Sequence, residues 1–128
     1  MAAPALSIIL PFRNAGAFLE RALRSCLEQT FNDFEIVAVD DASTDESEKL
    51  AGALASQDPR LRILHHSRHR GVSAAFQTGL DQANAPLIAR MDADDFALPD
   101  KFAKQIIMLR ENPNLAGVSC RVRIEKIR

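Results

Sequence analysis

The chain has 128 residues, a formal net charge of −1 at pH 7 and 47% hydrophobic residues. This length fits one domain that can bury a core. The near-neutral charge argues against nucleic-acid binding, because a nucleic-acid-binding domain of this size carries a clear excess of basic residues. Cys26 and Cys120 lie inside apolar patterns, which predicts two buried thiols in a protein from a reducing compartment.

The sequence lacks the marks of export and of membrane insertion. Residues 1–5 have no basic region followed by an apolar run, so they do not form a signal peptide. No apolar run approaches the roughly 20 residues that cross a bilayer. We therefore expect a cytoplasmic chain without a membrane segment, while membrane association of a longer parent protein stays open.

Apolar runs of strand length alternate with helical patterns along the chain. The predicted strands are residues 6–10, 34–39, 61–64, 87–91 and 115–122. Apolar residues recur at helical spacing within residues 18–27, 50–55, 72–83 and 102–109. This order predicts an α/β fold with a mostly parallel central sheet and helices on both faces.

Local signals mark where elements begin and where the chain stops. Ser43 and Glu46 have the capping-box spacing, so we expect them to open the second helix. Pro99 suits the first turn of the fourth helix. Residues 124–128 have the pattern of a strand or a strand exit with nothing after it, which predicts a truncated chain.

Polar residues gather after each of the first four predicted strands. In an open parallel sheet the carboxyl ends of the strands meet at one edge, and ligands bind there. We therefore expect one polar rim, made of residues 12–14, 40–45, 65–70 and 92–95.

Asp92, Asp94 and Asp95 place three carboxylates within four residues. These charges repel one another unless a cation offsets them, and Mg²⁺ often binds one or two carboxylates together with substrate phosphates. The alternative is a solvated acidic turn near Pro99. The position directly after an apolar strand favours a site for a metal and a phosphate group.

The other polar residues of the rim allow both binding and structural roles. A carboxylate of Asp40 or Asp41 can accept hydrogen bonds from a base or a ribose, or it can organise the turn with Ser43. Arg70 can pair with phosphate oxygens or remain a surface arginine. The three histidines of residues 65–69 have no cluster of other ligand types around them, so we do not expect zinc.

Several common sites are absent from the sequence. It contains no G-x-x-x-x-G-K, G-x-G-x-x-G or G-x-S-x-G motif, which argues against a P-loop, a dinucleotide-binding fold and a nucleophile elbow. The residues alone therefore predict an α/β domain with a metal and phosphate site on one rim.

Five segments, in order along the chain, resemble the motifs of the inverting family 2 glycosyltransferases. Residues 7–14 resemble the family's opening strand followed by proline, an aromatic residue and asparagine. Residues 35–45 match its nucleotide-recognition stretch, and Met91 to Asp95 match its metal motif. The other two segments are residues 25–30 and 71–75. The resemblance spans nearly the whole chain.

The resemblance implies a Rossmann-like A-type glycosyltransferase fold in which residues 1–128 form the donor-binding part and the acceptor-binding half is absent. It implies a nucleoside-diphosphate sugar as donor, most often a UDP-sugar, and a divalent metal, Mn²⁺ or Mg²⁺. The sugar passes to an unknown acceptor with inversion. The family's usual setting is the synthesis of cell-envelope polysaccharide or glycolipid.

Carried over position by position, the resemblance implies a nucleotide-binding set of Pro11, Asn14, Asp40, Asp41, Arg70 and Asp92. Within this set, the backbone near Pro11 and the carboxylate of Asp41 hold the base. Arg70 lies near the base or the diphosphate, and Asp92 approaches the ribose.

The resemblance also implies the metal ligand, Asp94, with Asp92 and Asp95 as further candidates. No catalytic base is assigned, because the family's base is expected beyond Arg128. The family often has Arg-Asn where Phe76 and Gln77 stand here. Phe76 falls on the apolar stripe of its helix, which predicts a packing role.

Other readings of the sequence stay open. One is a receiver-like signalling domain, although its paired acids normally follow the first strand. Another is a non-catalytic nucleotide-binding module. A third is a sugar-1-phosphate nucleotidyltransferase, although its opening Gly-rich loop is not seen at residues 11–16. A truncated domain leaves a sheet edge or an apolar face exposed, so we also expect self-association into a homo-oligomer.

Overall fold

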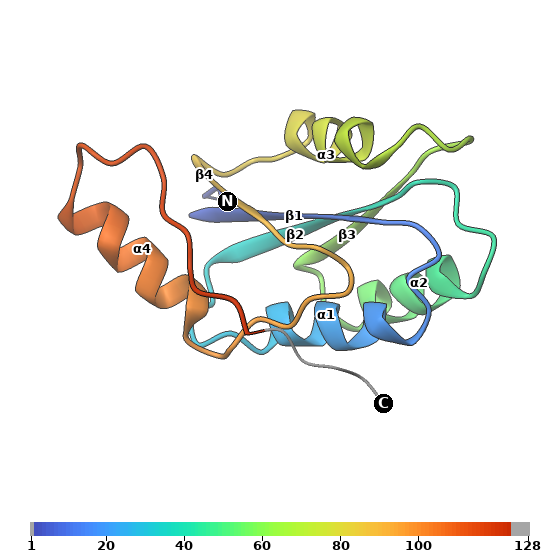
Figure 1. Cartoon of the computed structure of the whole chain (residues 1–128), viewed down its shortest axis with the longest axis horizontal. Helices are drawn as coiled ribbons and strands as arrows, with labels where there is room; N and C mark the ends of the chain where they lie inside the picture. The colour runs from blue at the N-terminus through green and yellow to red at the C-terminus, as the bar shows by residue number, and fades with distance from the viewer. Residues whose placement is uncertain (1, 124–128) are drawn as a thin grey trace.

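The computed structural model describes residues 2–123, which form a parallel sheet and the helices that cover it (Figure 1). The strands are β1 (Leu6–Phe12), β2 (Phe34–Asp40), β3 (Leu61–His65) and β4 (Leu87–Arg90). The helices are α1 (Ala17–Leu27), α2 (Ser47–Gln57), α3 (Val72–Asp81) and α4 (Lys101–Glu111). All neighbouring strands are parallel, in the order β3-β2-β1-β4. The predicted α/β fold is confirmed.

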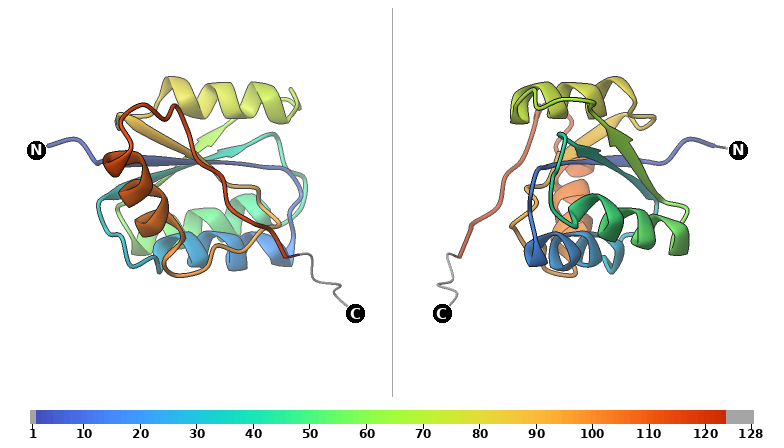
Figure 2. Two further views of the ribbon diagram at one scale, coloured as in Figure 1. Left: turned by 60° about the vertical axis from the view of Figure 1, so that its left-hand side comes forward. Right: turned by 90° about the vertical axis from the view of Figure 1, so that its right-hand side faces the viewer.

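The two central strands, β1 and β2, are buried along their whole length. Helices cover both of their faces, which explains why these strands read as continuous apolar runs rather than as alternating patterns. On one face, Ile8 and Leu10 pack in a core with α1, α2 and α4. On the other face, Ile9 packs against α3, so the sheet lies between two helical layers (Figure 2).

Helix α1 shows how the apolar period becomes a packed face. Its buried residues include Leu19, Leu23 and Cys26, which recur at helical spacing, while Glu20 and Arg24 form an ion pair on the outer side. Burial raises the pKa of the Cys26 thiol to about 12, so this thiol stays protonated. Cys120, which the sequence also predicted to be buried, is exposed.

Helix α3 approaches the sheet closely at Gly79, where a Cβ would lie 2.5 Å from Ile9 Cγ2 and 3.2 Å from Val39 Cγ2. Both of these partners are fully buried, so they have little room to move. Phe76 packs on the same side, against the core between α3 and the sheet, which agrees with the packing role predicted for it.

We expect Gly79→Ala to lower the free energy of unfolding by about 1–3 kcal/mol, because the added methyl overpacks a buried contact. Gly52→Ala is the matched control, since Gly52 lies in α2 with no atom within 4 Å of its added Cβ. Alanine is the better helix former there, so we expect a gain of about 0.5–1 kcal/mol. Urea denaturation followed by far-ultraviolet circular dichroism measures both. If both substitutions changed the free energy of unfolding in the same direction, the close approach of α3 to the sheet would be contradicted.

A buried polar network joins the strands near their amino ends. Glu35 of β2 accepts hydrogen bonds from Ser7 Oγ at 2.5 Å and from the backbone N–H of Asn84 at 2.7 Å. Its other oxygen accepts from Asn84 Nδ2 at 3.1 Å and from Arg62 at 3.2 Å. Ser7 in turn accepts from the backbone N–H of Ala85. The network therefore links β1, β2 and β3 with the turn that precedes β4.

The predicted fifth strand, residues 115–122, is wrong. These residues form no strand, and Leu115 and Val122 are 45% and 79% exposed. A β-branched run becomes a strand only where a neighbouring strand offers hydrogen bonds and a surface to pack on. Within residues 2–123, no strand pairs with this run. The predicted strand exit at residues 124–128 lies outside the described residues.

Two predicted helix starts are also wrong. Helix α2 begins at Ser47 after the N-cap residue Glu46, without a side-chain cap, so Ser43 and Glu46 form no capping box. The hydroxyl of Ser43 instead accepts a hydrogen bond from the backbone of Asn14. Pro99 precedes α4, which begins at Lys101, and its carbonyl accepts a hydrogen bond from Thr30. Across residues 2–123, no helix is long and apolar enough to span a bilayer.

Candidate functional site

A pocket of about 470 Å³ opens at the carboxyl edge of the sheet. Its walls come from residues 11–15 at the end of β1 and just after it, Asp41 after β2, His69 before α3, and residues 92–94 after β4. Because all four strands run in one direction, the segments that leave them meet at the same edge. The structure thus brings together polar groups that are far apart in the sequence.

The segments that leave β1 and β2 are tied to each other by Asn14. Its side-chain oxygen accepts hydrogen bonds from the backbone N–H groups of Thr44 at 2.7 Å and Asp45 at 3.2 Å. Asn14 has a φ of 49° and Ala42 has a φ of 60°, which is uncommon for residues other than glycine. Asn14, predicted to bind nucleotide, lines the pocket and uses its side-chain oxygen to shape the wall.

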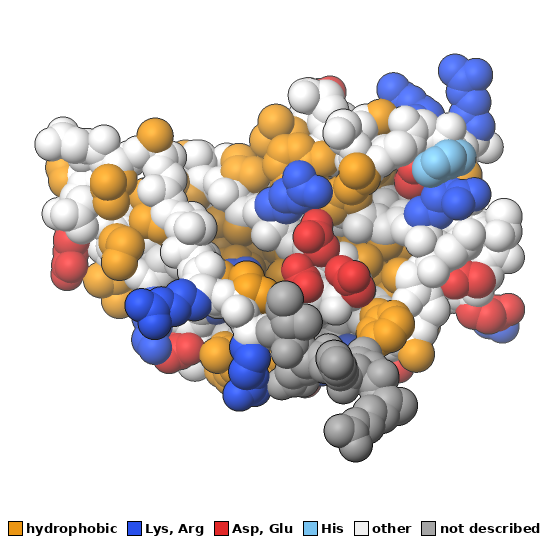
Figure 3. Space-filling view, in the orientation of Figure 1, with side chains coloured by type: hydrophobic (Ala, Val, Ile, Leu, Met, Phe, Trp, Pro, Cys, Tyr) orange, Lys and Arg blue, Asp and Glu red, His pale blue; other side chains and the backbone are white. Residues whose placement is uncertain are grey.

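The acidic segment after β4 forms another wall. Asp92 and Asp94 are exposed and line the pocket, and Figure 3 shows acidic side chains gathered on this face over the segment that follows β4. Burial raises the pKa of the Asp95 carboxyl, and the charges of Asp94 and Asp92 raise it further. Three carboxylates that repel one another beside a pocket are a donor set that suits a hard divalent cation.

The acidic segment is held in place by a buried latch on α1 and the residues just after it, formed by Ser25 and Gln29. Gln29 Nε2 donates to the carbonyl of Leu98 at 2.7 Å, and Gln29 Oε1 accepts from the N–H of Phe102 at 3.2 Å. Ser25 Oγ accepts from the N–H of Ala97 at 3.0 Å. Sequence reasoning did not assign a role to either residue. The signal was a serine on the predicted helical segment and a glutamine four residues later, just past its end.

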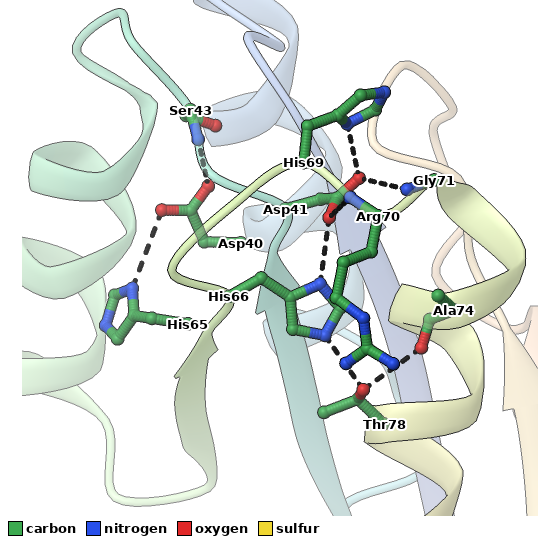
Figure 4. A network of polar contacts seen from close by, with 10 residues as sticks. All are labelled: Asp40, Asp41, Ser43, His65, His66, His69, Arg70, Gly71, Ala74 and Thr78. Carbon is green, nitrogen blue, oxygen red and sulfur yellow. Dashed lines mark hydrogen bonds and ion pairs between the residues drawn. The ribbon is translucent and has the colours of Figure 1, made fainter.

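Asp41 is buried, and its carboxylate is surrounded by donors (Figure 4). Oδ1 accepts from His66 Nδ1 at 2.8 Å and from the backbone N–H of Arg70 at 2.9 Å. Oδ2 accepts from the backbone N–H of Gly71 at 2.8 Å, and His69 Nδ1 also lies 2.8 Å from it. Burial alone raises the pKa of Asp41, but hydrogen bonding by these four residues outweighs burial and holds the pKa far below its usual range. The buried carboxyl therefore stays ionised.

Arg70 reaches Asp41 through its backbone N–H. Its side chain is exposed and is not among the residues that line the pocket. The sequence analysis considered His66 and His69 only as zinc ligands and rejected that role. In the structure both contact the carboxylate of Asp41 directly. Their role could not be read from spacing, because Asp41 precedes them by 25 and 28 positions.

Asp40 lies beside a second group of ionisable side chains, away from the pocket lining. Its Oδ1 accepts the backbone N–H of Ser43 at 2.9 Å, and its Oδ2 lies 3.5 Å from His65 Nδ1. Glu48 Oε1 lies 3.6 Å from the same nitrogen. Asp40, Glu48 and His65 thus offer three ligand atoms within 4.8 Å of one another. The two carboxylates therefore lie on either side of one histidine nitrogen, in a group that does not border the pocket.

The sequence matches a known protein family over nearly its whole length. The sequence profile described as Glycosyl transferase family 2 matches residues 7–128. A glycosyltransferase of Haemophilus influenzae, itself uncharacterized, is 34% identical over 109 residues, which are 85% of this chain and 44% of that protein. The GalNAc(5)-diNAcBac-PP-undecaprenol beta-1,3-glucosyltransferase of Campylobacter jejuni is 33% identical over 124 residues, 96% of this chain and 40% of that protein. The chain spans less than half the length of these relatives.

Solved structures show the same architecture. The mannosyltransferase PcManGT from Pyrobaculum calidifontis, in complex with GDP-Man and Mn²⁺, superposes with a TM-score of 0.86 at 28% identity, over 96% of this chain and 37% of that one. S. aureus TarS 1–349 in complex with UDP-GlcNAc superposes with a TM-score of 0.80 at 23% identity, over 85% of this chain and 32% of that one. The second likeness concerns the fold alone.

Proposed function

Since the chain belongs to glycosyl transferase family 2, we propose that it is the donor-binding part of an enzyme that transfers a sugar from a nucleoside diphosphate to an acceptor. The donor is a UDP-sugar in this proposal, the transfer inverts the anomeric centre, and a divalent cation takes part. The observation that carries the proposal is the pocket at the carboxyl edge, lined by Asp41, Asp92 and Asp94. The paired acids Asp40 and Asp41 stand at the end of β2, which argues against a receiver domain, whose paired acids normally follow the first strand.

Each wall of the pocket suits one part of such a donor. The segment around Pro11 offers hydrogen-bond acceptors for a base, the ionised Asp41 would hold the base once one of its present partners leaves, and Asp92 offers an acceptor for the ribose. Asp94, with Asp92 and Asp95 beside it, would hold Mn²⁺ or Mg²⁺. When bound, such a cation supplies positive charge that stabilises the leaving diphosphate. Support for a metal comes from the related mannosyltransferase, whose structure contains GDP-Man and Mn²⁺.

Other parts of the proposal rest on the family and not on the pocket. The catalytic base is expected beyond Arg128, so residues 1–128 bind donor but turn over little or no acceptor. A cytoplasmic location and self-association into a homo-oligomer stay predictions. Asp40 and Arg70 are proposed as further contributors near the base and the diphosphate, although neither side chain lines the pocket.

Calorimetric titration of UDP and GDP into the chain, with Mn²⁺ and with a chelator, tests the proposal. We expect Mn²⁺-dependent binding of UDP that Asp94→Ala weakens at least about tenfold, or about 1.4 kcal/mol. Asp33→Ala is the matched control, because it removes the same charge from an exposed position just before β2, at the opposite edge of the sheet. Binding that neither Mn²⁺ nor Asp94→Ala affects would contradict the metal site. Tighter binding of GDP than of UDP would change the proposed donor.

A further inference from the structure

The carboxylate of Asp41 has no free acceptor position in this structure. An ionised carboxylate offers about four lone-pair sites, two on each oxygen. His66 and Arg70 occupy those of Oδ1, and Gly71 and His69 occupy those of Oδ2. A ligand in the pocket can therefore donate to Asp41 only if one of these four partners leaves.

Three of the four partners are fixed. The N–H groups of Arg70 and Gly71 belong to the backbone at the start of α3, where Gly71 also accepts a hydrogen bond from Ala75. The His66 side chain is 4% exposed, and its Nε2 lies 2.8 Å from Thr78 Oγ1, so both ring nitrogens are engaged (Figure 4). Moving any of these groups means rearranging packed structure.

His69 is the partner that can leave. Its side chain is 57% exposed and its ring lines the pocket, whereas the other contacts of Asp41 come from backbone or from a buried ring. Asp41 and His69 both line the pocket, so releasing the His69 ring leaves Oδ2 with one vacant lone-pair site at the pocket wall. Asp41 then keeps three hydrogen bonds and its charge.

We propose that His69 is an exchangeable cap on Asp41, and that a nucleotide base binds by replacing the His69 ring with a ring N–H of its own. This inference rests on the proposed function, because it takes the pocket to be a nucleotide site. The vacant position accepts an N–H donor from a base, which uracil offers at N3. A base that presents no N–H group to Oδ2 gains no hydrogen bond by displacing His69.

The test compares two ligands with two proteins by calorimetry in the presence of Mn²⁺. UDP carries the N3–H donor, and N3-methyl-UDP lacks it. We expect His69→Ala to bind UDP about two- to tenfold more tightly than the unchanged chain, because the base no longer competes with the His69 ring for Oδ2. We expect the same substitution to leave the affinity for N3-methyl-UDP unchanged.

His65→Ala is the matched control, since His65 is also an exposed histidine, at the end of β3, but does not line the pocket. We expect it to leave UDP affinity unchanged. Equal or weaker UDP binding by His69→Ala, with clear binding by the unchanged chain, overturns the cap and leaves the proposed function standing. An equal gain for both ligands also overturns it, because the effect then does not involve the N3–H. Failure of both proteins to bind UDP or GDP overturns the cap and the proposed function together.

Discussion

Replacing Glu35 by alanine is expected to lower the free energy of unfolding by about 3 kcal/mol or more. The substitution leaves the Ser7 hydroxyl and two donors of Asn84 without their acceptor. Glu35 is only 8% exposed, so water cannot easily replace the lost carboxylate. Each buried donor that loses its partner costs about 1–3 kcal/mol. The chain has no Trp or Tyr, so urea unfolding is best followed by circular dichroism.

Two controls isolate the cause of this loss. Glu35→Gln keeps the shape and one acceptor oxygen, so its loss should be smaller. Glu20→Ala removes a carboxylate from an exposed pair with Arg24 and should cost less than about 0.5 kcal/mol. If Glu35→Ala costs no more than Glu20→Ala, the network does not stabilise the fold.

The effect of Glu35 should depend on pH. Burial raises the pKa of this carboxyl, but its hydrogen bonds with Ser7 and Asn84, helped by Arg62, outweigh burial and lower the pKa overall. The ionised group therefore stabilises the fold above its unfolded-state pKa, and this stability is lost as the pH falls through the lower folded-state pKa. The difference in free energy of unfolding between the unchanged chain and Glu35→Gln should become smaller as the pH falls through that acidic range.

Replacing Gln29 by leucine is expected to destabilise the fold by about 2–3 kcal/mol and to loosen the acidic wall of the pocket. Leucine keeps most of the volume but leaves the carbonyl of Leu98 and the N–H of Phe102 without their partners. Hydrogen exchange at Phe102 should become faster than in the unchanged chain, and Mn²⁺ affinity should fall because Asp92 and Asp94 are less well placed.

Gln77→Leu is the control for this substitution. Gln77 is an exposed glutamine of α3 that bonds to Asp81 on the helix surface, so its loss should change stability by no more than about 0.5 kcal/mol. If Gln29→Leu lowers stability but leaves Mn²⁺ affinity unchanged, the latch stabilises the fold without positioning the acidic segment.

The sequence predicts those helices and strands in which the pattern of apolar residues matches the buried face. Strands β1 and β2 stand out because helices cover both of their faces, and α1 stands out because one of its faces is buried. Residues 115–122 have a similar composition, yet strand formation also depends on a neighbour, which a single segment cannot specify. The start of α2 was misjudged because the Ser43 hydroxyl contacts Asn14, a residue 29 positions away.

The position of the candidate site could be predicted from the sequence, but the hydrogen-bond partners of its residues could not. Parallel strands made the shared edge predictable, so the segments after β1, β2 and β4 were expected to meet. The partners of Asp41 were not predictable, because they depend on the path of the chain between β3 and α3. The same holds for Ser25 and Gln29, whose partners lie about 70 positions further along the chain.

The strand order has a consequence for synthesis of the chain on the ribosome. Strand β1 is made first but lies between β2 and β4, so one of its edges stays unpaired until residues 87–90 have emerged. At about 5–20 residues per second, the roughly 75 residues between them take about 4–15 s to translate. During that interval the nascent chain exposes an apolar edge to other chains. Chaperone binding to ribosome-bound intermediates should therefore peak after β2 emerges and decline once β4 is available.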